Sequence, residues 1–71
     1  KSKLTLEILE MIEQKPGVWN NLITKEFKVD HKTIQYHLNK LIDLDLIKFK
    51  KEGRKKKIYP NFDSEYFNQN D

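Results

Sequence analysis

Val29-Asp30-His31-Lys32-Thr33-Ile34-Gln35-Tyr36-His37-Leu38-Asn39-Lys40-Leu41 is the most clearly patterned stretch of the 71-residue chain. Its apolar residues Ile34, Leu38 and Leu41 recur at the three- and four-residue spacing of one helix face. The aspartate just ahead of this pattern is a suitable N-cap. The stretch therefore predicts an amphipathic helix from about residue 31 to 44.

A first helix is expected from about residue 2 to 15, because apolar residues recur there at the same spacing. These residues are Leu4, Ile8, Met11 and Ile12. Pro16-Gly17 then gives a strong stop signal. Leu6 and Leu9 lie off the main face, so a second side of this helix is also apolar. That side either packs against the C-terminal tail or forms a contact between two copies of the chain.

A second helix is expected from about residue 20 to 27. Its N-cap candidates are Asn20 and Asn21, and its expected buried residues are Leu22, Ile23 and Phe27. Trp19, just before it, is expected in the core or at the hinge, with base stacking as the alternative. Residues 28–30 leave a three-residue connection to the next helix, which is the spacing of a helix-turn-helix.

A β-hairpin is expected over about residues 46–59. Ile47-Lys48-Phe49-Lys50 alternates apolar and charged residues, as a half-buried strand does. Gly53 marks the turn, and Lys57-Ile58-Tyr59 is the expected returning strand. The tail, residues 60–71, has enough aromatic side chains to form a short C-terminal helix. The fold class expected for residues 1–71 is a single α+β domain, mostly helical, with three helices and a small antiparallel hairpin.

The composition excludes several classes of protein. There is no cysteine, so disulfides and cysteine-bound zinc are excluded, and no apolar run is long enough to span a bilayer. His31 and His37 stand too far apart around the helix to share a metal. No paired carboxylates, nucleophile–base arrangement or phosphate-binding glycine loop is present, so we expect neither an enzyme nor a cofactor. We expect a cytoplasmic, nucleoid-associated protein, and the first residue, Lys1 rather than Met, indicates a domain of a longer chain.

The positive charge is concentrated in one short segment. The whole chain carries a net charge of +3, but residues 48–57 hold seven basic side chains and one acid, which gives +6 there and −3 elsewhere. Such asymmetry usually marks a surface that binds a polyanion. The alternative is a charged hairpin that only faces solvent.

The outward face of the predicted third helix carries side chains that can read bases. The expected base-reading residues are Lys32, Thr33, Gln35, Tyr36 and Asn39. In the major groove, Gln and Asn can pair with adenine, Lys can reach guanine and Thr can meet the thymine methyl. For Tyr36 the alternative is a covering role over apolar surface beside the second helix.

The remaining candidates are suited to phosphates, whose neutralisation by cations releases condensed counterions. They are His37, Lys40, Lys50, Lys51, Arg54, Lys55 and Lys56. Arg54, beside the predicted turn, can enter a narrow minor groove, whose negative potential favours a guanidinium. The lysines would set orientation rather than sequence.

The run from Thr33 to Leu41, followed by Leu46-Ile47 and the basic hairpin, resembles winged helix-turn-helix transcription regulators. The arsenic-repressor-like and antibiotic-resistance-regulator-like groups of archaea and bacteria are the most similar. Their pattern is Thr-hydrophobic-x-x-His-Leu-x-x-Leu, three variable residues, then Gly-Leu-Ile. The resemblance covers about residues 4–59.

This resemblance implies a regulator that binds double-stranded DNA and usually acts as a homodimer. We expect it to repress by occlusion rather than to activate. The third helix would lie in the major groove and the hairpin, or wing, on the backbone or in the minor groove. Asp45 stands where the family prefers Gly, so the end of that helix is expected to differ. The alternative function is a protein-interaction module in a larger assembly, which predicts an exposed apolar patch and no need for the basic hairpin.

Overall fold

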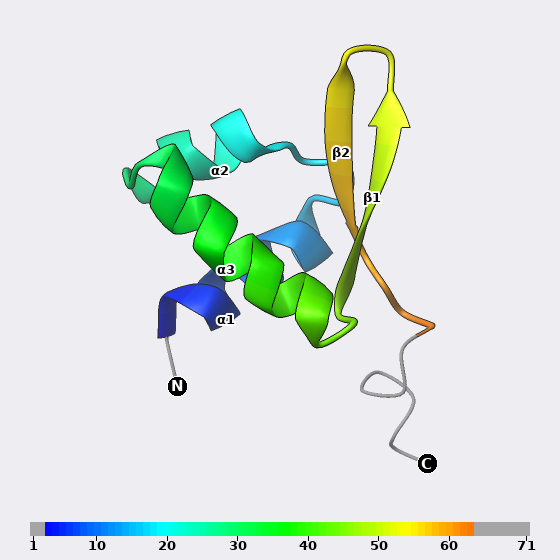
Figure 1. The fold of residues 1–71 in the computed structure, drawn as a ribbon, viewed down its shortest axis with the longest axis horizontal. Helices are drawn as coiled ribbons and strands as arrows, with labels where there is room; N and C mark the ends of the chain where they lie inside the picture. The colour runs from blue at the N-terminus through cyan, green and yellow to red at the C-terminus, as the bar shows by residue number, and fades with distance from the viewer. Residues whose placement is uncertain (1–2, 64–71) are drawn as a thin grey trace.

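The computed structural model describes residues 3–63 of the chain. Its elements are α1 (Lys3–Gln14), α2 (Asn20–Phe27), α3 (His31–Asp43), β1 (Ile47–Glu52) and β2 (Lys55–Pro60). Three helices followed by an antiparallel hairpin confirm the expected α+β fold (Figure 1). A helix start at Ser2 and a short C-terminal helix beyond residue 63 fall outside the described residues. No helix within residues 3–63 is long and apolar enough to cross a membrane.

One core joins the three helices to the hairpin. Its fully buried side chains are Ile8, Ile12, Ile23, Ile34, Leu38, Leu41 and Ile58. The expectation that Leu22 is buried was wrong, since this side chain is 36% exposed. Consecutive helix residues point about 100° apart, and α2 turns Ile23 toward the core, which leaves Leu22 at the surface.

The connection between α2 and α3 is three residues long, as the sequence predicts. Lys28 ends α2 in a left-handed conformation (φ 56°) and donates its N–H to the carbonyl of Thr24 at 2.7 Å. Asp30 is the N-cap residue of α3. Its carboxylate accepts a 2.6 Å hydrogen bond from the Thr33 hydroxyl, which holds the pKa of Asp30 below its ordinary value.

The N-terminus of α2 differs from the expectation. Asn20 and Asn21 lie inside the helix, and the N-cap residue is Trp19. The Trp19 carbonyl accepts the N–H groups of Leu22 at 2.9 Å and Ile23 at 3.3 Å. Trp19 can take this place without a capping side chain because the segment before it is held by the hairpin.

The end of α3 was expected to differ from the family because Asp45 replaces Gly, and this expectation was wrong. Asp45 adopts the left-handed conformation (φ 62°). The N–H of Leu46 reaches the carbonyl of Leu41 at 2.9 Å and that of Asp45 reaches Ile42 at 2.8 Å, which is a Schellman motif. Asn61 donates to the Asp45 carbonyl and carboxylate, each at 3.1 Å, and stabilises this conformation.

The hairpin is tied to the segment that precedes α2. Its register pairs Ile47 with Pro60 and Glu52 with Lys55, so the turn consists of Gly53 and Arg54. Gly53 has φ +64° at the first turn position, where two-residue turns of the II′ type favour Gly. On the other edge of β2, Ile58 exchanges two backbone hydrogen bonds of 2.8 Å with residues 17 and 18.

Candidate nucleic-acid interface

The outward face of α3 is available to a ligand. Asp30 begins the helix so that Ile34, Leu38 and Leu41 face the core, and the opposite side is left to polar residues. Four of the five predicted base-reading residues, Lys32, Gln35, Tyr36 and Asn39, are exposed, and Thr33 is half-buried. Tyr36 is 58% exposed, and its ring contacts are with His37 (centroids 5.2 Å apart) and with the Lys40 ammonium.

Hydrogen bonds link the side-chain amides of Gln35 and Asn39 on α3 to that of Asn20 on α2. Gln35 donates from Nε2 to Asn39 Oδ1 at 3.0 Å, and Asn20 donates from Nδ2 to Gln35 Oε1 at 3.5 Å. The chain of hydrogen bonds runs from α2 to α3 and limits the rotamers of the two α3 amides. Asn20 was expected only as a cap, and its contact across the two helices has no signal in the sequence.

A groove separates α3 from the hairpin. It has a volume of about 470 Å³ and opens between Gln35 of α3, Asn20 at the start of α2, and the tip of the hairpin. The cationic residues that line it are Arg54, Lys55 and Lys56. Phe49 and Leu38 also line it. Gln35 of α3 and the tip of the wing therefore border the same hollow.

The hairpin holds like charges against each other. Lys50 lies opposite Lys57, and Lys51 lies opposite Lys56, an arrangement that destabilises a sheet unless an anion or solvent offsets it. One acid partly compensates: Glu52 lies 3.4 Å from the ammonium of Lys57. Glu52 also accepts the Tyr59 hydroxyl at 2.9 Å, which lowers the pKa of Glu52 and raises that of Tyr59.

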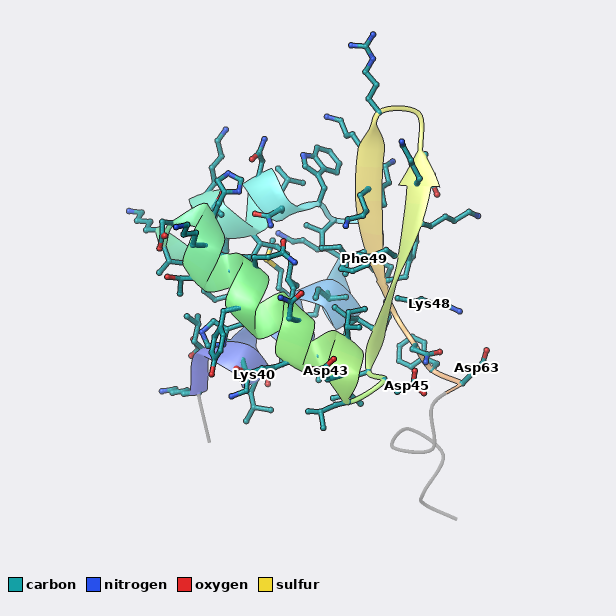
Figure 2. The ribbon with its side chains drawn as sticks, viewed as in Figure 1. Lys40, Asp43, Asp45, Lys48, Phe49 and Asp63 are labelled. Carbon is teal, nitrogen blue, oxygen red and sulfur yellow. The ribbon has the colours of Figure 1, made fainter. Side chains whose placement is uncertain are left out.

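The lysines of the hairpin do not all face the same way. Side chains alternate along a strand, and Figure 2 shows Phe49 on the side toward the helices and Lys48 on the opposite side. Lys50 lines a second hollow with Lys48 and Tyr59. Of the predicted phosphate-binding lysines in the hairpin, Lys55 and Lys56 line the groove beside α3, and Lys50 and Lys51 do not.

His37 was predicted to contact phosphate, and the structure does not support this role. The side chain is 7% exposed and points toward α1, where its Nδ1 shares a 2.6 Å hydrogen bond with the Thr5 hydroxyl. Burial lowers the pKa of His37, and the positive charge of Lys40 lowers it further. A histidine at the margin of a helical apolar face can turn either way, and here the Thr5 hydroxyl offers a partner inside.

The lower end of α3 is less suited to binding an anion. The Lys40 ammonium lies 5.3 Å from the centre of the Tyr36 ring and is half-buried. Figure 2 shows Asp43, Asp45 and Asp63 near the base of the molecule, at the end opposite the hairpin turn. These carboxylates would repel phosphates, so the favourable surface is the half that contains the start of α3 and the tip of the hairpin.

Comparison with known protein families gives a match. A family model described as winged helix-turn-helix DNA-binding matches residues 1–48. This range contains α1, α2 and α3 and reaches the beginning of β1. No curated protein and no solved structure matches the chain.

Proposed function

Because the chain belongs to the winged helix-turn-helix DNA-binding family, we propose that it is a sequence-specific transcription regulator that represses by covering its site on double-stranded DNA. The observation that carries the proposal is the groove shared by Gln35 of α3 and by Arg54, Lys55 and Lys56 of the wing. The expected reader of base edges and the expected binders of phosphate stand on its two sides. A duplex that admits α3 would therefore meet the wing as well.

In the proposed complex α3 enters the major groove, which is wide enough for one helix. Its base-reading residues would be Lys32, Thr33, Gln35, Tyr36 and Asn39. Lys51, Lys55 and Lys56 would contact the backbone, and Arg54 at the turn would reach the minor groove. Lys40 lies over the Tyr36 ring at the less favourable end of α3, so it would act only through the overall positive potential. Lys50 faces the second hollow, so it would act through the overall positive potential rather than through a contact in this groove.

A homodimer is part of the proposal. Leu6 of α1 is 58% exposed and lies on the side of the helix away from Ile8 and Ile12, which favours a contact between two copies. In a two-fold dimer, the two α3 helices would read half-sites one helical turn of DNA apart. Exposed Leu6 and Leu44 are also what the alternative, a protein-interaction module, predicts. That alternative leaves the opposed lysines of the wing without a role.

Selection of bound sequences from a random duplex pool tests the proposal. We expect enrichment of one motif, and a palindromic motif if the regulator is a dimer. The same selection with Gln35 and Asn39 replaced by Ala is the control, because it keeps the wing and removes two readers. Binding without any enriched motif would contradict sequence-specific regulation, and no binding at low salt would favour the interaction module.

A further inference from the structure

Trp19 lies at the junction between α2 and the wing. The ammonium of Lys55 lies 4.3 Å from the centre of its ring, and that of Lys57 lies 5.7 Å away. Its carbonyl caps α2, and the neighbouring Val18 pairs with Ile58 of β2. The backbone that carries the ring is thus tied to α2 on one side and to β2 on the other. Trp19 also lines the groove beside α3.

The two lysines on this ring differ in what else they contact. Lys57 is half-buried and forms an ion pair with Glu52 at 3.4 Å. Lys55 is exposed and forms no ion pair with any residue in the range 3–63. A cation over an aromatic face is attracted by the ring quadrupole, and an ammonium has three N–H donors. Lys55 can therefore keep its place on the ring and still donate to a phosphate.

We propose that Trp19 is a positioning residue for DNA binding, which holds the Lys55 ammonium at the rim of the groove where it meets a backbone phosphate. This inference rests on the proposed function. It assigns to Trp19 a role other than base stacking, because the ring is half-buried and carries a lysine at its face. Without the ring, Lys55 would have to lose its side-chain freedom at the moment of binding, which lowers affinity.

A double-mutant cycle between Trp19 and Lys55 tests this role. Binding of the selected duplex is measured at about 0.1 M salt for W19L, K55M and the double variant. K55M should weaken binding by about tenfold, the effect of one lost phosphate contact. W19L should weaken it by about two- to fivefold, the range of an exposed cation–π contact, and should have no further effect in the K55M background.

Lys51→Met is the matched control, since it removes the same charge from the same hairpin, at a residue opposite Lys56 and not over the Trp19 ring. W19L and K51M should be additive. W19F keeps an aromatic face and should restore most of the affinity, and thermal unfolding of each variant separates loss of fold from loss of binding. Trp19 is the only tryptophan, so its fluorescence without DNA should change with K55M and not with K51M.

The outcomes separate the two proposals. If the wild-type protein binds no duplex, the proposed function fails and this inference fails with it. If the wild type binds but W19L has the same effect in the wild-type and K55M backgrounds, or couples equally to Lys51, then Trp19 only supports the fold and the positioning role is overturned.

Discussion

Among single residues, the linked amides of α3 have the most direct consequence for recognition. Gln35 and Asn39 are joined at 3.0 Å before any DNA is present, so each limits the conformations open to the other. Bidentate recognition of a base needs a fixed amide orientation. We infer that the two residues act as a unit, oriented by Asn20 from α2.

Replacement of Gln35 or Asn39 by Ala should therefore cost about 1–3 kcal/mol on the selected site, and the double variant should cost less than the sum. Residues in one hydrogen-bond network are non-additive in this way. Titration of a labelled duplex with the three variants measures the effect. Equal losses on random DNA would show that these residues do not read bases.

His37 predicts a pH dependence of stability. Its pKa is lowered in the folded protein, first by burial and then by Lys40, whereas the unfolded chain takes up a proton near pH 6.5. The unfolded state thus binds more protons, and the unfolding free energy should fall as the pH drops below about 6.5. Urea unfolding at several pH values between about 7 and about 5 should show this fall.

His37→Gln should flatten the dependence in that window, because it removes the buried imidazole whose pKa is lowered. Asp30 and Glu52 contribute outside this window. The pKa values of Asp30 and Glu52 are lowered from 3.8 and 4.5, so their contributions are lost only at more acidic pH. A profile that is the same with and without His37 would contradict the burial argument.

At the level of the elements, the backbone conformation at the end of α3 costs a small amount of conformational free energy. Asp45 holds a left-handed conformation (φ 62°) that Gly adopts freely. Asp45→Gly should therefore raise the unfolding free energy by roughly 0.5–1 kcal/mol, reduced by the lost contact with Asn61. Asp45→Val should lower it, because a branched side chain is strained there. Denaturant midpoints compare the stabilities of the two variants. A Gly variant that is no more stable than the Val variant would contradict the left-handed conformation of residue 45.

The wing should show opposite effects on stability and on binding. Lys51 lies opposite Lys56, so Lys51→Glu replaces a repulsive pair by an attractive one. The change should stabilise the hairpin by about 0.2–1 kcal/mol. It should also weaken DNA binding, because a phosphate contact becomes a repulsion. Thermal unfolding measures the stability and duplex titration measures the affinity. A variant that is more stable and also binds DNA more tightly would contradict a role of Lys51 in binding phosphate.

Local signals predicted the elements, and tertiary contacts decided what the sequence could not show. Pro16-Gly17 and Gly53 mark ends and turns through backbone preferences that need no partner. The eight-residue α2 has few apolar positions, so the sequence did not determine which of its faces points to the core. For this reason Leu22 was wrongly predicted to be buried. The sites of Trp19 and His37 depend on Lys55 and Thr5, which are far from them in sequence. The base-reading roles of α3 stay predictions.

At the scale of the whole molecule, the placement of three aspartates relative to the hairpin turn bears on how a duplex approaches. The cationic hairpin turn stands at one end, and Asp43, Asp45 and Asp63 lie near the other (Figure 2). A polyanion approaching such a protein is oriented before contact. The acidic end limits how much of α3 a duplex can cover, so the footprint should be confined to the half that holds the start of α3 and the wing.

Removal of four wing lysines should reduce the dependence of affinity on salt. In the variant with Lys50, Lys51, Lys55 and Lys56 replaced by Ala, the slope of log affinity against log salt should shrink by roughly 2.7–3.6, since each lost contact removes about 0.9. The lower figure applies if Lys50 makes no contact. Binding should weaken on every duplex, and the Gln35/Asn39 double variant should keep the wild-type slope. An unchanged slope would exclude the wing from the interface.

The backbone pairing of residues 17 and 18 with Ile58 makes the hairpin a partner of the loop before α2 rather than a free arm. A hairpin transferred to another protein would therefore need residues 16–19 as well, because without them it would lose these backbone hydrogen bonds. Conversely, an insertion in that loop should tilt the hairpin as a unit, and should shift its tip relative to the proposed DNA site without changing any of the proposed contact residues.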